Sequence, residues 1–320
     1  MSSDANFEEP IQRIKNRLEE LRGYPESPAR TREIQKLQDK LEKVSLEIYG
    51  NLAPWQKTLV ARHPARPFCL DYIRILTHDF VEWHGDRAFA DDPAIVAGFA
   101  FIGERPVAIV GHQKGRDTKE KIHRNFGMPR PEGYRKALRV MKLAEKFHRP
   151  LFCFIDTPGA YPGLDSEERG VSEAIARNLF EMSHLKTPII ATVTGEGGSG
   201  GALGIGIADV VLMLEHSVYS VISPEGCAAI LWKDQGRAKD AAEAMRVTAA
   251  DCKALGIIDE VIPEPAGGAH ADPVATVDSV GRILMAHLAR LDGLSMEQLL
   301  DARYAKFRKM GVWEEAASGR

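Results

Sequence analysis

The chain has 320 residues, of which 44% are hydrophobic, and a formal net charge of −3 at pH 7. This length can bury a full hydrophobic core, while so weak a charge gives no reason to expect nucleic-acid binding. No apolar run approaches the roughly 20 residues of a membrane span, and the acidic, polar start of the chain is unlike a secretory signal, so we expect a cytoplasmic α/β protein.

The first 60 residues predict a helical hairpin. Apolar residues recur there at spacings of three and four, which is typical of helices with a narrow apolar stripe. The first stripe contains Ile11, Ile14, Leu18 and Leu21, and the second contains Ile34, Leu37, Leu41, Val44 and Ile48. Between them, Ser27 and Pro28 suit the N-cap and first turn of the second helix. Two helices with such narrow apolar stripes cannot bury them well without another surface. The hairpin therefore either packs on its own domain or acts as an oligomerisation arm. We predict domains over residues 1–60 and 61–320.

From residue 67 onward, strand and helix patterns alternate. Strands are predicted at 95–101 and 106–111 around a Gly103 turn, and at 151–155, 188–194, 210–214, 219–222 and 260–262. Helices are predicted at 134–147 and 171–182, after the stretches 223–226 and 248–251, and as a closing pair within 272–310. Such alternation implies a largely parallel sheet covered on both faces. Functional loops should then gather at the carboxyl ends of the strands.

Two glycine-rich loops occupy such strand ends. The loop DTPGAYPG at 156–163 contains two prolines and two glycines, which predict a rigid pocket wall. The loop GEGGSGGALG at 195–204 leads into a short apolar helix. Glycine leaves backbone N–H groups open to close approach, and a helix N-terminus favours anions. We therefore predict one shared site at which a negatively charged oxygen binds.

Other interpretations of the second loop are available. Gly195, Gly197 and Gly200 match the dinucleotide pattern G-x-G-x-x-G, with Glu215 as a candidate ribose ligand. However, only about ten residues separate Gly200 from the next strand, whereas a parallel crossover needs a dozen or more. The glycines could also simply let a helix pack closely on the sheet, although each costs around 1 kcal/mol in a helix.

A serine hydrolase is a further alternative. Residues 197–201 match the nucleophile elbow G-x-S-x-G, with Ser199 as the nucleophile. A triad could be completed by His270 or His287 with Asp234 or Asp259. The remaining interpretation is an oxyanion hole without a side-chain nucleophile, in which adjacent N–H groups stabilise an enolate or ureido oxygen.

Cysteines and histidines show no metal-ligand spacing. The four cysteines, Cys69, Cys153, Cys227 and Cys252, form no C-x-x-C pair and predict neither a zinc site nor a disulfide framework. Three histidines have no ligand spacing either, namely His84, His112 and His123. We expect no metal site on this chain.

Long motifs resemble the carboxyltransferase α subunits of bacterial multisubunit acetyl-CoA carboxylase. The resemblance covers nearly the whole chain and is carried by segments 84–100, 111–139, 154–163, 167–179, 195–206, 219–233 and 262–270. It implies a crotonase-like α/β fold, a spiral of ββα units with the active site between two subunits. The N-terminal helical hairpin accompanies that fold.

The resemblance also implies an activity and partners. Carboxybiotin on a separate biotin carboxyl carrier protein would give its carboxyl group to acetyl-CoA and form malonyl-CoA, the committed step of fatty acid synthesis. Two α chains would assemble with two β subunits, which alone carry a zinc ribbon, and with biotin carboxylase. No membrane or nucleic acid is expected to take part. A non-catalytic scaffold subunit is the remaining alternative.

The oxyanion-hole residues are carried over from the family motifs, whereas the substrate contacts are predicted from the glycine loops and from a basic stretch. The backbone of Gly200, Gly201 and Ala202 is expected to form the oxyanion hole for the biotin ureido oxygen, with no side-chain base required. Substrate contacts are expected from Gly159, Ala160, Gly197, Gly198, Lys114 and Arg116. The two cations would contact coenzyme A phosphate or the carrier protein, or belong to a solvated helix face. Gly201→Val is expected to block the hole without preventing folding.

Overall fold

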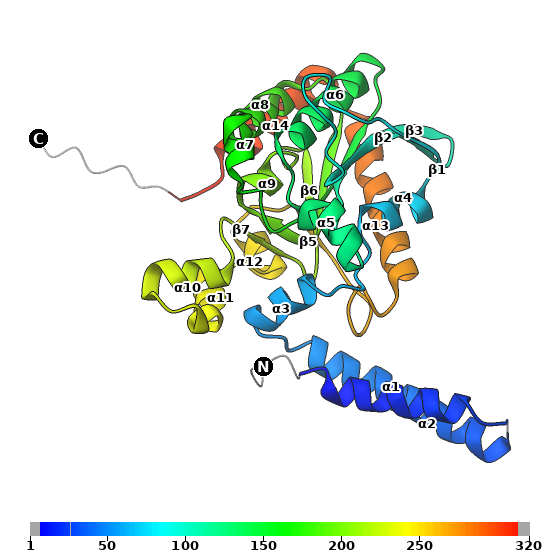
Figure 1. The fold of residues 1–320 in the computed structure, drawn as a ribbon. Helices are drawn as coiled ribbons and strands as arrows, with labels where there is room; N and C mark the ends of the chain where they lie inside the picture. The colour runs from blue at the N-terminus through cyan, green and yellow to red at the C-terminus, as the bar shows by residue number, and fades with distance from the viewer. Residues whose placement is uncertain (1–6, 26, 313–320) are drawn as a thin grey trace, which may run out of the picture.

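A mixed eight-stranded sheet forms the centre of the computed structural model, which describes residues 7–25 and 27–312 (Figure 1). The strands are β1 (His78–Glu82), β2 (Ile95–Ile102), β3 (Arg105–His112), β4 (Leu151–Thr157), β5 (Ile189–Gly198), β6 (Val210–Leu214), β7 (Val218–Ser220) and β8 (Glu260–Ile262). Their order is β1-β2-β3-β4-β5-β6-β8, and β7 pairs with the end of β5. β1, β2 and β3 are antiparallel, and every pairing from β3 to β8 is parallel. The predicted strands are confirmed, whereas β1 was not predicted.

Both faces of the sheet are covered, as the alternation of elements predicted. Every residue of β4 is buried, and its side chains alternate between two cores. Cys153 and Ile155 join the core under α6 (Pro131–Lys146) and α8 (Val171–His184). Phe152 and Phe154 join the opposite core, under α4 (Cys69–Leu76) and α13 (Pro273–Leu291). A strand buried on both sides is a rigid support for the loop that follows it.

A bulge in β5 extends this strand beyond its predicted end at residue 194. Ile155 of β4 pairs with Val193, but Thr157 pairs with Gly197, so β5 holds extra residues between these pairs. Before the bulge β5 pairs with β6, and after it β5 pairs with β7. The first glycines of the second loop therefore belong to a strand and not to a loop.

Two buried side chains satisfy the backbone groups of this bulge. The Asp156 carboxylate accepts the Glu196 N–H at 2.9 Å. The Arg66 guanidinium donates to the Thr194 carbonyl at 2.9 and 3.1 Å and is paired with Glu264 at 2.7 Å. A buried backbone group without a partner would be costly, so these contacts fix the strand shape that leads into the site.

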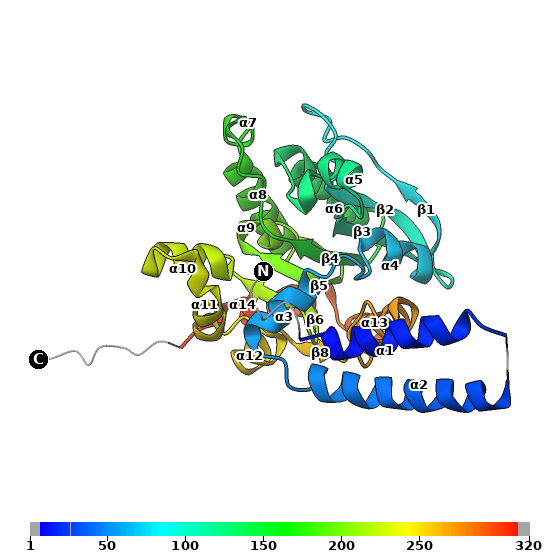
Figure 2. The same cartoon turned by 60° about the horizontal axis from the view of Figure 1, so that its bottom comes forward.

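The N-terminal helices are α1 (Glu9–Arg22) and α2 (Pro28–Tyr49), which lie side by side away from the sheet (Figure 2). Ser27 caps α2 by accepting the Arg30 N–H at 3.3 Å, as predicted. The apolar stripe of α1 is buried, but the stripe of α2 is only half-buried. α3 (Pro54–Ala61) contacts β5 and β7. The domain boundary at residue 60 stays a prediction.

The remaining elements are short except for the last helix. They are α5 (Thr118–His123), η2 (Asn125–Gly127), α7 (Leu164–Glu168), α9 (Ser199–Leu203), α10 (Pro224–Trp232), η3 (Gln235–Arg237), α11 (Ala238–Met245), α12 (Ala249–Ala254) and α14 (Met296–Arg308). The helices predicted after 223–226 and 248–251 form and are capped, since Ser223 accepts the Gly226 N–H and Thr248 accepts the Asp251 N–H. Within the described ranges, no helix combines the length and apolarity needed to span a bilayer.

Candidate active site

The two glycine-rich loops touch each other at the carboxyl ends of β4 and β5. A Cβ added at Gly201 would lie 2.5 Å from the Gly159 carbonyl carbon and 2.6 Å from the Ala160 nitrogen. A Cβ added at Gly198 would lie 2.2 Å from the Pro158 carbonyl oxygen. Only glycine permits so close an approach of two backbones. The prediction that the two loops come together is confirmed.

Both loops line one cleft of about 980 Å³. Among the predicted site residues, the cleft brings together Gly159, Ala160, Gly200 and Gly201. A Cβ at Gly159 would meet nothing within 4 Å, and one at Gly200 would meet only Ile175, at 3.6 Å. The backbone at these two glycines is therefore open to a ligand atom.

The other predicted backbone residues lie beside this cleft or beneath it. Gly197 and Gly198 line a narrow neighbouring space that shares Arg62 with the cleft. Ala202 is fully buried, and its side chain packs in the core. The cleft is thus lined by fewer of the predicted residues than the motif alone suggested.

The turn from β5 into α9 begins at Ser199. Its φ of 51° lies in the left-handed region, and its side chain is exposed on the cleft. The first turn of a helix leaves N–H groups without intrahelical acceptors, and here that turn contains Gly200 and Gly201. Adjacent N–H groups at an open cleft can stabilise an oxygen that gains negative charge.

A chain of ion pairs runs from buried groups beneath the glycine loops to the partly exposed Arg62 and Glu225 at the cleft. The Lys114 ammonium lies 2.8 Å from Asp156 and 2.9 Å from Glu196. The Arg62 Nε donates to Glu196 at 2.6 Å, and its two terminal nitrogens bond Glu225. Burial alone would lower the pKa of Lys114, but the two carboxylates raise it above its usual value. Burial would also raise the pKa of Glu196, but Lys114 and Arg62 hold it below its usual value. These groups are therefore charged at neutral pH.

The two predicted phosphate ligands have partners within the chain. Lys114 is occupied by Asp156 and Glu196. Arg116 pairs with Asp71, donates to the Pro64 carbonyl and lies 4.6 Å from the centre of the Phe68 ring. Their contact with coenzyme A or a carrier stays a prediction.

Sequence reasoning did not select Arg62 or Glu196. Arg62 carries no motif, and it is 134 residues away from Glu196 along the chain. Glu225 lies in the first turn of α10, where any carboxylate suits the helix dipole, so its place in the sequence does not single it out. The single usable sign was the position of Glu196 inside the glycine run.

The alternative serine triad is not assembled. His287 pairs with Glu260 at 2.8 Å, and His270 stacks on His63. The candidate acids are also engaged elsewhere, Asp234 with the Gly236 N–H and Asp259 with the Val211 N–H. No described hydrogen bond joins either histidine to the exposed serine of the cleft.

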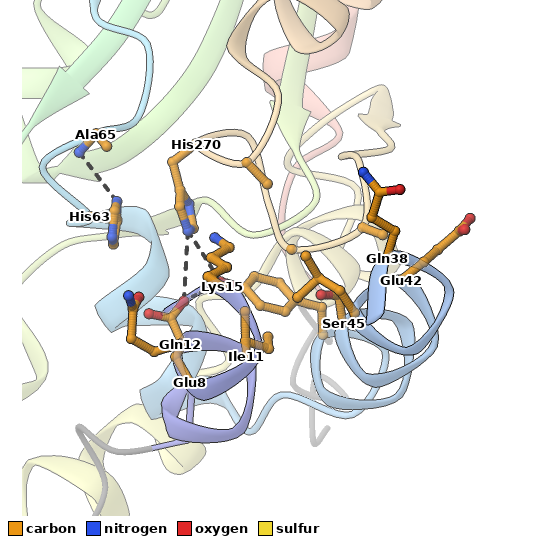
Figure 3. Close-up of a pocket in the computed structure, with 15 residues that line it drawn as sticks. Glu8, Ile11, Gln12, Lys15, Gln38, Glu42, Ser45, His63, Ala65 and His270 are labelled. Carbon is orange, nitrogen blue, oxygen red and sulfur yellow. Dashed lines mark hydrogen bonds and ion pairs between the residues drawn. The ribbon is translucent and has the colours of Figure 1, made fainter. Parts of the chain in front are cut away.

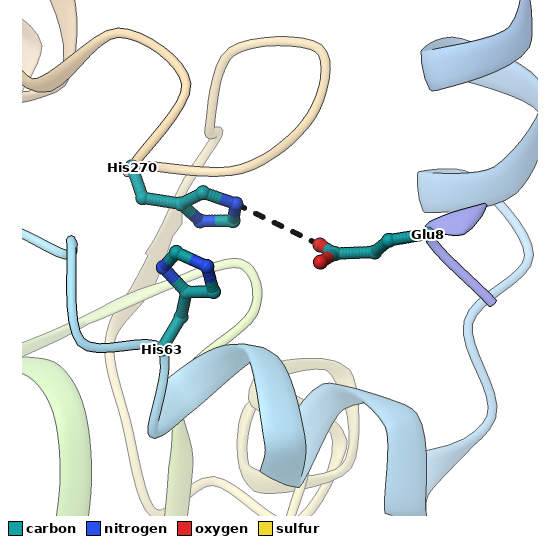
Figure 4. A group of neighbouring side chains, drawn as sticks. All are labelled: Glu8, His63 and His270. Atoms are coloured by element: carbon teal, nitrogen blue, oxygen red, sulfur yellow. Dashed lines mark ion pairs between the residues drawn. The ribbon is translucent and has the colours of Figure 1, made fainter. Parts of the chain in front are cut away.

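Glu8, His63 and His270 form a group whose possible ligand atoms lie within 4.8 Å of one another (Figure 4). The two imidazole rings are stacked, with centroids 3.7 Å apart and planes at 21°. Their in-plane lone pairs therefore run side by side and do not converge on one ion. The Nδ1 of His63 accepts the Ala65 N–H at 3.2 Å, which places the proton of the neutral ring on Nε2. A metal-ligating nitrogen must be unprotonated, so this arrangement does not suit a metal ion.

The same group joins the hairpin to the rest of the chain. Tyr49 at the end of α2 bonds both Glu8 and His270, beside a cavity of about 480 Å³ (Figure 3). His270, whose Nε2 lies 3.7 Å from the Glu8 carboxylate, lowers the pKa of Glu8 to about 2. Burial lowers the pKa of His63 to about 4. We interpret the group as a docking contact.

Comparisons with known proteins agree with this architecture. Residues 4–311 match the family described as "Acetyl co-enzyme A carboxylase carboxyltransferase-like". The chain is 56% identical, over 97% of its length and 96% of theirs, to the acetyl-coenzyme A carboxylase carboxyl transferase subunits alpha of Bacillus thuringiensis (strain Al Hakam) and Bacillus cereus (strain AH187).

Solved structures share the fold at low identity. Transcarboxylase 12S, with methylmalonyl-coenzyme A and methylmalonic acid bound, is 20% identical with a TM-score of 0.55, and the alignment covers 80% of this chain and 44% of that one. A Pseudomonas malonate decarboxylase hetero-tetramer in complex with coenzyme A is 18% identical with a TM-score of 0.56, and the alignment covers 68% of this chain and 90% of that one. The β subunit of P. aeruginosa geranyl-CoA carboxylase is 15% identical with a TM-score of 0.54, and the alignment covers 83% of this chain and 48% of that one. The predicted crotonase-like α/β fold is confirmed.

Proposed function

The chain belongs to the acetyl-coenzyme A carboxylase carboxyltransferase α-subunit family, and we propose that it and a β subunit together form the carboxyltransferase that converts acetyl-CoA to malonyl-CoA. The carboxyl group comes from carboxybiotin held on a separate biotin carboxyl carrier protein. The reaction is the committed step of fatty acid synthesis. The observation that carries the proposal is the contact between two glycine loops at one open cleft.

In this proposal the backbone of α9 binds the biotin side of the reaction. Gly200 and Gly201 donate N–H groups to the ureido oxygen, and the N–H of Ala202 completes the turn although its side chain is in the core. The open backbone at Gly159 and Gly200 gives the oxygen room to approach. Donors held in place before the reaction stabilise developing charge without reorganisation. Biotin, when present, supplies the carboxyl group from its ureido ring.

The opposite wall and the ion pairs hold this geometry. Gly159 is fixed by the Thr157 hydroxyl, which accepts its N–H at 3.1 Å and donates to its carbonyl at 2.7 Å. Gly197 and Gly198 let the two strand ends pack closely. Lys114 supports the site by neutralising the two carboxylates under it, and Arg116 anchors the segment before α4.

The relatives are named as α subunits, which implies that further proteins complete the enzyme. We propose that the zinc ribbon lies on the β subunit, that biotin carboxylase and the carrier protein complete the complex, and that the assembly is cytoplasmic. The thioester-side oxyanion hole then comes from the β subunit, because residues 7–25 and 27–312 offer one such loop pair. Each half of the reaction thereby uses a separate subunit.

A carboxyl-transfer assay on α alone, β alone and the mixture tests this function. We expect malonyl-CoA formation only by the mixture, because two oxygens must be stabilised by two different chains. Robust transfer by α alone would overturn the shared-site proposal. Transfer by β alone at the rate of the mixture would favour the scaffold alternative.

A further inference from the structure

Arg62 is the only cation among the described residues that line the cleft. Arg62 directly follows α3, and its side chain is 28% exposed. It lines the cleft together with residues of both glycine loops. The Nε is occupied by Glu196, but both terminal nitrogens face Glu225 in a two-pronged contact. This fork of an arginine is the group that matches a carboxylate best.

The two acids that hold Arg62 are not equivalent. Glu196 lies in β5, its side chain is 11% exposed, and Lys114 also holds it. Glu225 lies at the start of α10, its side chain is 35% exposed, and Arg62 is its only ion-pair partner among the described residues. Glu225 can therefore leave with a smaller loss of contacts than Glu196.

We propose that Arg62 binds the carboxylate of a carboxylated substrate at the position that Glu225 occupies in this structure. Exchange of one carboxylate for another leaves the local charge unchanged, so the incoming anion need only displace Glu225 toward solvent. Acetyl-CoA has no such carboxylate and gains nothing from Arg62. This inference rests on the proposed function and adds to it a determinant of selectivity.

Two bound species share this chemistry, the malonyl carboxylate and the carboxyl group on biotin. Binding of malonyl-CoA and of acetyl-CoA to the αβ complex, measured by titration calorimetry, examines the first. The KM for carrier protein carboxylated by biotin carboxylase examines the second. Either species satisfies the proposal if it responds to the variants below while acetyl-CoA does not.

Glu225→Gln is the first variant, because it removes the competing charge at a partly exposed position. We expect the Kd for malonyl-CoA or the KM for the carboxylated carrier to fall about three- to tenfold. This range corresponds to the free energy of a half-exposed ion pair, which the incoming carboxylate no longer has to break. The Kd for acetyl-CoA should stay within about twofold, a change of a fraction of RT in binding free energy.

Arg62→Lys should act in the opposite direction. It keeps the charge but loses the fork, so affinity for the carboxylated species should fall about tenfold. Because this variant also loses contacts with Glu196, its thermal melting is compared with wild type. If it does not fold, Glu225→Gln decides alone.

Glu167→Gln is the matched control, since Glu167 lines the same cleft and has no described bond to Arg62. It removes the same charge and should shift affinity for the carboxylated species less than Glu225→Gln. If both variants shifted this affinity equally, the effect would come from the net charge of the cleft and not from Arg62, which would overturn the inference. Equal changes for acetyl-CoA and malonyl-CoA would overturn it too. A wild-type complex without transfer activity would instead overturn the proposed function.

Discussion

Gly200 and Gly201 are neighbours in the sequence, but their surroundings differ. Gly201 faces the backbone of the other loop at 2.5 Å, whereas Gly200 faces only a side-chain methyl group, at 3.6 Å. Gly201 is therefore required for packing, and Gly200 is open to the cleft. The close contact argues against normal folding of Gly201→Val, because backbone atoms of Gly159 and Ala160 cannot move aside as a flexible side chain can.

Alanine at each position separates these roles. Gly201→Ala should lower the free energy of unfolding by about 1–3 kcal/mol, because its methyl group overpacks two backbones. Gly200→Ala should change stability by less than about 1 kcal/mol yet reduce carboxyl transfer roughly tenfold or more by crowding the oxyanion donors. Thermal melting and transfer rates of the αβ complex provide both readouts. Wild-type transfer by Gly200→Ala would place the hole elsewhere.

Ser199 adopts a left-handed backbone without a triad around it. We expect Ser199→Gly and Ser199→Ala to transfer carboxyl groups within about threefold of wild type, whereas loss of a true nucleophile costs around a millionfold. Glycine is the matched control, because it accepts a positive φ without steric cost. Covalent labelling of Ser199 by a serine-directed probe, or near-complete loss of activity in both variants, would restore the hydrolase alternative.

At the scale of elements, the hairpin of α1 and α2 makes few polar contacts with the sheet domain among the described residues, and these involve His270. Glu8 precedes α1 and Tyr49 ends α2, whereas His63 follows α3, which contacts β5 and β7, and His270 follows Ala269, which is buried in the core of the sheet domain. The apolar cluster beneath them joins Ile11 to α2 and α3. Protonation of the polar group should therefore loosen the hairpin before the sheet unfolds.

Docking of the hairpin should weaken as the pH falls. His63 has a pKa near 4 in the fold against an ordinary 6.5, so its contribution is present above about pH 6.5 and declines toward pH 4. Glu8 has a pKa near 2 against an ordinary 4.5, so its contribution is lost between about pH 4.5 and 2. Hydrogen-exchange protection of α1 amides, corrected for intrinsic rates, measures this docking.

Two substitutions assign the halves of that profile. Glu8→Gln should remove the dependence below about pH 4.5, and His63→Phe should remove the part between about pH 6.5 and 4 while keeping a ring to stack. A protection profile of α1 that is flat from pH 7 to 4 in the wild-type chain would contradict the assignment.

At the scale of the whole molecule, the apolar stripe of α2 stays half-exposed. The hairpin lies away from the sheet, on the far side of α3 (Figures 1 and 2). A cut after residue 60 would remove most of α3, which contacts β5 and β7. Truncation experiments should therefore stop at Gly50, where α2 ends.

Removal of residues 1–50 tests the oligomerisation arm. If the half-exposed stripe is buried by a partner chain, the truncated α chain should form an assembly with β of lower mass or affinity. The glycine loops should keep their fold, as judged by thermal melting. Light scattering after size exclusion measures the mass. An unchanged complex would assign the hairpin to its own chain alone.

Features that depend on neighbours along the chain could be predicted from the sequence. Apolar spacing predicted α1, α2 and the main strands, and the caps at Ser27, Ser223 and Thr248 formed where their residue types indicated. The glycine loops and the family were likewise visible, because backbone access and motif length are local properties. These features need no knowledge of which segments meet.

Contacts between distant charges and backbones, in contrast, depend on how the segments pack together. Arg62 reaches Glu196 across 134 residues and Glu225 across 163, and no periodicity relates them. Lys114, in a basic stretch, became a buried partner of carboxylates because β3 and β4 are adjacent and parallel. Likewise, β5 extends beyond its predicted end at residue 194, because a bulge lets its glycines pair with β7. Ion pairs and strand registers are set by the packing of distant segments, which a one-dimensional pattern does not record.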